Sequence, residues 1–426
     1  MSLTYDELRK GVDGDAVGVR CRTVLQPLGG AADKVFPPTY SVADNAETKY
    51  ATEKRRVPSA DGVAGPVTEA VVLDSVASQA NRLELALLDA IRDGQLAAPV
   101  TSVDFGSSGL PGLDRISDYE ASHRIFDALL RDSYDGDQLF RNGPAGRAIT
   151  EARPQDAAGL YYHSPHTLVF GGWDSTGPRG GLGAKYERAI TSEIVALGIE
   201  RGAKTASRID PIGIERQAGQ LYEAADGTWT LDPALAVTEA GKPKLFGAKE
   251  SGQRGEAGRP SQANLGNVTP SIDYRAGGVT ASEIVATTVL SFIQLRRLRF
   301  PTRPDGSAFE EGQHREAERA ARTALAALGL TAAALAFEAG FDLRSRCVLV
   351  ADGMITFAMV GRDGTALEFG LSSADALKLT AEAADRAAAA GLPWRDGELL
   401  LRPAERLVEL IRRSRKLTET GESGKE

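Results

Sequence analysis

The stretch from Leu168 to Gly198 reads LVFGGWDSTGPRGGLGAKYERAITSEIVALG and is the most informative part of the chain. It predicts a short apolar strand over 168–170, a glycine-rich loop, and a helix with Tyr186, Ile190 and Ile194 on its apolar face. Glycine lets a backbone approach a ligand closely, and the unpaired N–H groups at a helix start favour an anion. The stretch therefore predicts a loop that contacts phosphates beside an aromatic surface. Its contacting residues would be Trp173, Ser175, Thr176, Gly177, Arg179, Gly180, Gly181 and Lys185.

The loop matches neither of two common nucleotide-binding motifs. A mononucleotide P-loop places Ser or Thr directly after its lysine, whereas Lys185 is followed by Tyr186. A dinucleotide fingerprint needs Gly-x-Gly-x-x-Gly after a strand, whereas Gly171 and Gly172 are adjacent and Pro178 interrupts the turn. A nucleotide-binding enzyme is therefore disfavoured. From these residues alone, a purely structural glycine-rich turn and a phosphate-contacting loop both remain open.

Four segments together carry a resemblance to a known family. They are VFPPTY at 35–40, LDSVASQANRLE at 73–84, WDSTGPRGGLG at 173–183 and QLRRLRFP at 294–301. In this order they resemble the CRISPR-associated RAMP proteins that form the backbone of the type I-G (formerly I-U) effector complex, the Cas-seven type. The resemblance covers residues 21 to about 301 and is weaker beyond.

The resemblance implies an α+β fold with a ferredoxin-like (RRM-type) core and RNA binding without catalysis. Copies would assemble along one CRISPR RNA and hold it for pairing with target DNA. The other partners would be a large subunit and a combined capping and RNA-processing subunit. No cofactor, metal or membrane is expected. A second wall of RNA contacts would come from Ser75, Ser78, Gln79, Asn81 and Arg82, and an early basic segment would add Lys34, Lys49, Tyr50 and Arg55.

Composition is compatible with this interpretation. The 426 residues are 42% hydrophobic and 25% charged, enough for a large core. We expect a cytoplasmic protein, because an uninterrupted apolar run of membrane-spanning length and a basic-then-apolar leader are both absent from the sequence. Cys21 and Cys347 lie in apolar settings and are expected to be buried free thiols. The net charge of −8 argues against general nucleic-acid binding but permits a local basic groove.

The organisation predicted from the sequence is one RNA-binding core over 1–315, with insertions at about 41–66, 99–117 and 217–275. Strands are expected at 21–25 and 71–73, and helices at 75–93, 118–132 and 281–299. Residues 316–426 form either an appended α+β extension or the completion of the core. This tail should contain helices at 317–328, 374–390 and 405–415, and a hairpin around Asp352-Gly353.

Other side chains suggest alternative functions, such as RNA cleavage or metal binding. An endoribonuclease that cuts RNA paired to the guide would use a loop aspartate, and Asp104, Asp114 and Asp118 are the candidates. No paired carboxylates or His–carboxylate pattern supports it. His163 and His166 have no further metal-ligating residues near them in the sequence, so we expect both to have a structural role. Three arginines, Arg296, Arg297 and Arg299, would bind RNA, neutralise a helix dipole or contact the next subunit.

Overall fold

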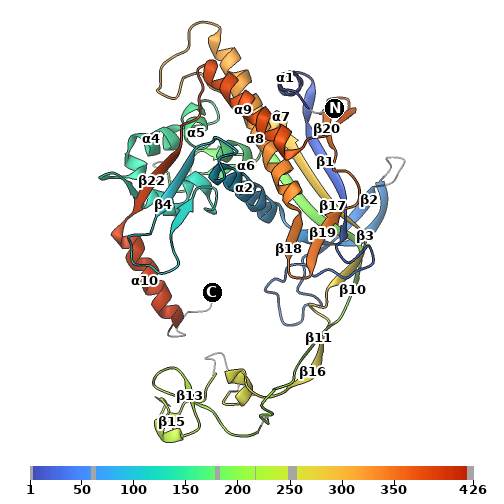
Figure 1. Ribbon diagram of the computed structural model, residues 1–426, viewed down its shortest axis with the longest axis vertical. Helices are drawn as coiled ribbons and strands as arrows, with labels where there is room; N and C mark the ends of the chain where they lie inside the picture. Colours follow the sequence, from blue (N-terminus) through green and yellow to red (C-terminus); the bar gives the residue numbers. More distant parts are fainter. Residues whose placement is uncertain (1–2, 59–63, 178–182, 216, 248–256, 420–426) are drawn as a thin grey trace. The chain divides into compact units, whose positions relative to one another are not determined.

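The computed structural model describes residues 3–58, 64–177, 183–215, 217–247 and 257–419. The chain divides into two units (Figure 1). The first contains Met1–Pro38, Ala51–Glu200 and Thr280–Arg413. The second contains Thr39–Tyr50, Arg201–Val279 and Ser414–Glu426. The fold is α+β, as expected from the sequence.

A large sheet forms the frame of the first unit. Among the described residues it has nine strands, in the order β18-β19-β1-β17-β10-β3-β2, while β20 pairs with β1 and β21. Their bounds are β1 Ala16–Pro27, β2 Thr52–Pro58, β3 Ala64–Asp74, β10 Ile190–Arg201, β17 Val279–Ser291, β18 Phe341–Arg344, β19 Cys347–Ala351, β20 Phe357–Gly361 and β21 Ala366–Phe369. Cys21 in β1 lies opposite Thr288 on one side and Phe357 on the other. β1 is therefore an interior strand, longer than the 21–25 predicted from the sequence.

Two interior strands were expected to be helices. Residues 186–197 form β9 (Lys185–Tyr186) and β10, and residues 281–299 form β17 followed by the short α7 (Phe292–Leu295). β10 is buried on both faces over Ile194 to Leu197. A strand of this kind has a continuous apolar run, which cannot be distinguished from a buried helix by periodicity. Both helix predictions are wrong. The predicted strand at 168–170 is also wrong, because these residues form the last turn of a helix, α6 (Pro165–Phe170).

Helices cover one face of the sheet (Figure 1). Their bounds are α1 Tyr5–Asp13, α2 Val76–Arg92, α8 Gln313–Ala339 and α9 Ser373–Ala389. α8 packs against α1, α2, α6 and α9. It lies so close to the sheet and to α6 that a Cβ at Gly329 would be 3.1 Å from Leu290 in β17 and 3.3 Å from Val169 in α6. α8 is apolar and long enough to cross a membrane, but 89% of its most apolar window is buried, as in a core helix.

A polar link fixes β10, β17 and α2 together beneath these helices. The Ser192 hydroxyl donates to the Gln79 amide oxygen at 2.8 Å and lies 2.7 Å from the Thr288 hydroxyl. All three residues are buried. Buried polar atoms without partners cost free energy, so this link favours one register of β10 against β17.

A smaller sheet of five strands lies elsewhere in the first unit, in the order β5-β4-β22-β6-β7 among the described residues. β22 pairs in parallel with β4, so residues 398–401 lie beside residues 100–103. The tail after residue 316 thus supplies strands to both sheets of this unit. The bounds here are β4 Val100–Asp104, β5 Arg115–Ser117, β6 Ser133–Asp135, β7 Gln138–Leu139, β22 Glu398–Pro403, α3 Ala128–Arg131, α4 Pro144–Glu151, α5 Ala158–His163 and α10 Glu405–Glu419.

Three further predictions were wrong. Residues 99–116, within the predicted insertion at about 99–117, were expected to form a loop, but they contain β4 and the start of β5. The expected helix over 118–132 is broken into short turns, since Arg124 has a φ of 53° and Asp127 is extended. The expected hairpin around Asp352-Gly353 is absent among the described pairings, because β19 and β20 pair with successive segments of β1 instead of with each other. The helices predicted at 75–93, 374–390 and 405–415 are confirmed by α2, α9 and α10.

The second unit has little regular structure. A two-stranded ribbon of β11 (Lys204–Arg208) and β16 (Val268–Asp273) leads to two small ladders. The ladders pair β12 (Tyr222–Glu223) with β13 (Trp229–Thr230) and β14 (Thr238–Glu239) with β15 (Lys242–Pro243). The sequence predicts an irregular insertion at about 217–275, which lies within this unit. Several large apolar side chains of the unit are exposed, among them Ile209, Ile212, Leu231, Leu235 and Tyr274.

Candidate nucleic-acid interface

The glycine-rich loop is held at its base by a short ladder. β8 (Gly172–Trp173) follows α6 and pairs with β9, so that Gly172 lies opposite Tyr186 and Trp173 lies opposite Lys185. Gly172 needs its lack of a side chain, because a Cβ there would be 2.8 Å from Thr167 and 2.9 Å from Phe126. Directly opposite residues of an antiparallel pair point to the same face. Trp173 is half exposed and Lys185 is exposed, so the ladder presents an aromatic ring and a cation side by side.

Arginines from other segments fix the start of the loop. Arg141 donates to the buried Asp174 carboxylate at 2.9 Å and to the Thr176 carbonyl. Arg131 donates to the Thr176 hydroxyl at 3.3 Å. Ser175 and Thr176 remain exposed, whereas Gly177 is buried. The first part of the loop therefore has a defined position on the first unit.

Two of the loop glycines serve the packing of the chain on itself. A Cβ at Gly177 would be 2.7 Å from the Asp174 carboxylate, and a Cβ at Gly183 would overlap the Asp174 carbonyl oxygen. Packing against Asp174 is therefore enough to explain glycine at these two positions, without a contact to a ligand. Arg179, Gly180 and Gly181 lie outside the described residues.

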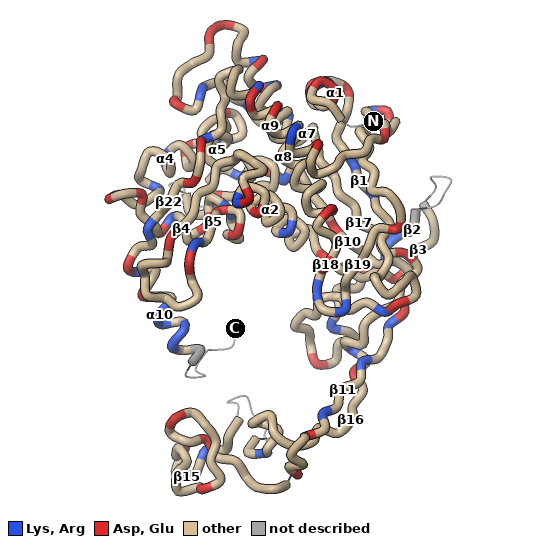
Figure 2. Tube along the Cα trace, in the orientation of Figure 1, with Lys and Arg blue, Asp and Glu red and all other residues tan. Residues whose placement is uncertain are grey.

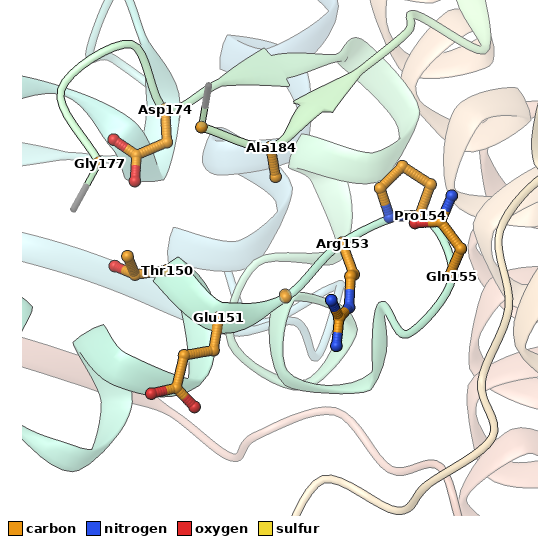
Figure 3. Close-up of a pocket in the computed structure, with 10 residues that line it drawn as sticks. Thr150, Glu151, Arg153, Pro154, Gln155, Asp174, Gly177 and Ala184 are labelled. Carbon is orange, nitrogen blue, oxygen red and sulfur yellow. The ribbon is translucent and has the colours of Figure 1, made fainter. Parts of the chain in front are cut away.

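A cavity of about 610 Å³ lies between the two ends of this loop and the end of α4 (Figure 3). Its lining includes Thr150, Glu151, Arg153 and Gln155 on one side and Asp174 and Ala184 on the other. Arg153 is exposed and makes no ion pair with a described residue. The mixture of donors and acceptors suits a polar ligand such as a ribose or phosphate.

The source of positive charge differs from the sequence expectation. The helix expected after the loop is replaced by β9 and β10, so the helix start that was to supply N–H groups does not occur in residues 185–201. An anion here would instead meet the side chains of Lys185 and Arg153, together with Arg131 and Arg141, whose charges are partly balanced by Asp132 and Asp174. Sequence reasoning missed Arg131, Arg141 and Arg153, because their meeting with the loop depends on tertiary structure.

The predicted second wall at the start of α2 makes mainly internal contacts. Ser75 caps α2 by accepting from the Ser78 N–H. Gln79 and Arg82 both donate to the buried Asp74 carboxylate, at 2.7 and 2.9 Å. Arg82 also donates to two carbonyls of β18. Gln79 is only 4% exposed, so its amide is committed to the interior, while Asn81 is exposed and Ser78 is half-buried.

The early basic segment is divided between the units. In the first unit, Lys34 lies 5.4 Å from the Phe36 ring, and Arg55 donates to Glu193 at 2.8 Å and to Glu53. In the second unit, the Lys49 N–H donates to the Arg275 carbonyl, and its side chain is half-buried. Tyr50 is 6% exposed, and its hydroxyl accepts from the Gly278 N–H at 2.7 Å. Tyr50 is thus oriented inward.

The three candidate nuclease aspartates are not assembled into a site. Asp104 lies 3.7 Å from Arg115 and accepts from the Gly106 N–H. The Asp114 carbonyl accepts from Phe105 in the turn that follows β4. Asp118 is completely buried. These positions give no catalytic carboxylate pair facing the loop.

Asp118 belongs to a buried polar cluster. The Ser164 hydroxyl donates to Asp118 at 3.1 Å and lies 3.3 Å from His166 Nδ1, and the His166 ring stacks on Tyr119. Burial raises the pKa of Asp118 to about 7 and holds the pKa of His166 well below its usual value. Asp118, Ser164 and His166 all have no exposed surface. The trio has the residue types of a catalytic triad, but a substrate cannot reach it. His163 is also buried, and no group of three metal-ligating side chains occurs in the described part of the chain.

The three arginines after β17 have separate structural partners. Arg296 donates to the carbonyls of Gly11, Val12, Gly14 and Ala16 at 2.6–2.9 Å, at the end of α1. Arg297 pairs with Glu187, and Arg299 pairs with Glu318 at 3.2 Å. Arg296 thus neutralises the C-terminus of a helix. That helix is α1, and not the helix that was expected at 281–299.

Comparison with known proteins relates part of the chain to a described family. No curated protein matches the chain. Residues 19–201, which include most of β1, the α2 segment, the Trp173–Lys185 ladder and β10, match the model of the family described as CRISPR-associated protein GSU0053. Over these residues the chain is therefore similar to a family of CRISPR-associated proteins.

Proposed function

We propose that the protein is a non-catalytic backbone subunit of a type I-G CRISPR effector complex. It assembles in several copies along a CRISPR RNA in the cytoplasm and presents that RNA for pairing with target DNA. Its neighbours in the complex are further copies, a large subunit and a capping and RNA-processing subunit. The family match over residues 19–201 supports a role in CRISPR defence, and the four sequence segments support the more specific assignment.

The observation that carries RNA binding is the exposed pair of Trp173 and Lys185. An aromatic face stacks on a base of any identity, and a lysine contacts phosphate without reading sequence. Because the two residues are cross-strand neighbours, they would offer a base contact and a phosphate contact within about one nucleotide of each other. Such contacts suit a guide whose spacer sequence varies.

The element order supports an RRM-type core. Taken in chain order, β1, α2, β10, β17, α8 and β19 give β-α-β-β-α-β, with other elements inserted between them: β2 and β3 before α2, β4 to β9 with α3 to α6 before β10, β11 to β16 before β17, α7 before α8, and β18 before β19. In space the four strands lie in the order β19-β1-β17-β10.

A binding and cleavage experiment tests the proposal. Labelled single-stranded RNAs of several unrelated sequences should bind with similar affinity, and a complementary RNA added with or without a divalent metal should remain intact. Failure to bind any of the RNAs would overturn the proposal. Cleavage of the complementary strand would instead favour the endoribonuclease alternative.

A further inference from the structure

Two surfaces of the first unit are complementary to each other. One is the outward face of α10, here called the α10 face and defined by Arg406, Leu410 and Arg413. These positions are four and three residues apart, so they lie on one side of the helix. The Leu410 side chain is 65% exposed and is flanked by the two arginines. Arg406 and Arg413 have acidic partners, Asp132 and Glu409, but their side chains are still 62% and 74% exposed.

The other surface is a groove between α2, the end of α8 and β18, here called the α2–α8 groove. It has a volume of about 290 Å³, and its apolar lining includes Leu85, Phe337 and Phe341. Leu85 is 41% exposed, an unusual state for a leucine beside two buried aromatic rings. Asp89 and Asp342 also line it; both are exposed, and neither carboxylate has an ion-pair partner among the described residues.

We propose that the α10 face of one copy docks into the α2–α8 groove of a second copy. Leu410 would fill the apolar floor, and the arginines on either side of it would meet the two carboxylates of the rim. A helix seated by an apolar anchor with charges around it is a common recognition mode. The partner is a second copy because both complementary surfaces belong to this chain.

The α10 face cannot swing into the groove of its own copy without breaking existing contacts. Arg406 donates to Asp132 at 2.7 Å, and Arg412 donates to the Ser108 carbonyl at 2.6 Å. These contacts hold α10 beside the smaller sheet. Docking between different surfaces of successive copies is head-to-tail, and such an interface repeats without limit unless it closes into a ring. This inference rests on the proposed assembly along RNA and names the surfaces that would produce it.

Sedimentation velocity of the full-length protein tests the docking. Leu410→Asp and Leu85→Asp each place a charge on an apolar contact, and each should weaken self-association by about tenfold or more, about 1.4 kcal/mol. Leu367→Asp is the matched control, because Leu367 is a 73% exposed leucine on β21, away from both surfaces. It should associate as the wild type does.

Mixing the two defective proteins gives the sharper result. The Leu85→Asp protein keeps an intact α10 face, and the Leu410→Asp protein keeps an intact groove. The mixture should therefore form dimers but no longer species. A charge exchange adds a second readout: Arg413→Glu and Asp89→Lys should each weaken association, and the double variant should regain part of it.

Wild-type association in the Leu410→Asp protein, or a mixture that stays monomeric, would overturn the docking model. An equal loss in the Leu367→Asp control would also contradict it, since the effect would then be general. RNA binding by each variant is measured separately with labelled single-stranded RNA. Variants that bind RNA but do not associate support the docking surfaces. A wild-type protein that does not bind RNA would instead contradict the proposed function itself.

Discussion

Lys185 and Trp173 occupy fixed positions on a two-residue ladder, so their separate contributions can be measured. Lys185→Ala should weaken the binding of all single-stranded RNA sequences about equally, because a phosphate contact carries no base identity. Loss of one such contact should reduce the slope of log K against log salt by about 0.7. Binding titrations at several salt concentrations measure this slope. Lys378→Ala, an exposed lysine on α9, is the control; an equal change in both variants would show that Lys185 has no special role.

Trp173→Ala should lower RNA affinity by about 1–3 kcal/mol, the range measured for one stacked base. The salt slope should stay unchanged, because no charge is removed. Trp229 in β13 is 42% exposed and provides a matched control in the second unit. A Trp173→Ala protein with wild-type affinity would place the base-stacking surface elsewhere.

Asp118 gives a prediction on stability rather than on binding. Its pKa is about 7 when folded and is raised by burial from an ordinary value near 4. Between these two values the folded state holds a proton that the unfolded state has lost, so this group makes stability fall as pH rises from about 4 to 7. The depressed pKa of His166 acts in the opposite direction below pH 6.5 or so.

Asp118→Asn removes only the first of these contributions. Thermal melting from pH 4 to 8 should show that the stability of the variant, relative to wild type, increases with pH over this range. An unchanged difference across the range would mean that Asp118 does not retain its proton on folding.

The residue-scale site was only partly predictable from the sequence. The loop stretch and its exposed Trp173 and Lys185 stand out by composition, and the ladder places them together. Gln79 and Tyr50 looked like surface polar residues, yet both are buried, because their partners Asp74 and Gly278 lie on other segments. Arg141 reaches the loop over a separation of 33 residues, and nothing in the local pattern indicates that contact.

At the scale of elements, local signals predicted several helices, through the capping residue before α2 and the high alanine content of α9, but they did not identify the interior strands. Ser75 and Ser372 cap α2 and α9 as such residues commonly do. β10 and β17 were taken for helices because an interior strand covered on both faces loses the alternation that identifies a strand. Their identity follows from neighbours far along the chain, such as β1 opposite β17.

The link between Arg296 and the end of α1 is an element-scale prediction. Arg296→Met should destabilise the protein by about 2 kcal/mol or more, because several carbonyls lose a charged donor. Arg297→Met, the adjacent arginine, loses only an exposed pair with Glu187 and should cost less than about 1 kcal/mol. Chemical denaturation of both variants measures the difference. Equal losses of stability would contradict a capping role for Arg296.

At the scale of the whole molecule, basic and acidic side chains are interspersed along the trace (Figure 2), in keeping with a net charge of −8. Most arginines near the candidate interface are partly neutralised by carboxylates, as Arg141 is by Asp174. A protein of this kind would bind nucleic acid through a few local contacts repeated over many copies, rather than through one broad basic surface. Repetition along the guide would then supply the affinity that a single copy lacks.

The most direct test of RNA-guided assembly is the nucleic acid that the protein carries when purified from cells containing its CRISPR array. We predict a multimer that contains RNA of one uniform repeat–spacer length, because successive copies would protect the guide along its whole length. Extraction and sequencing of the bound nucleic acid, together with the mass of the complex, give the answer. A monomer free of nucleic acid in the presence of the array would contradict assembly of the protein along a CRISPR RNA.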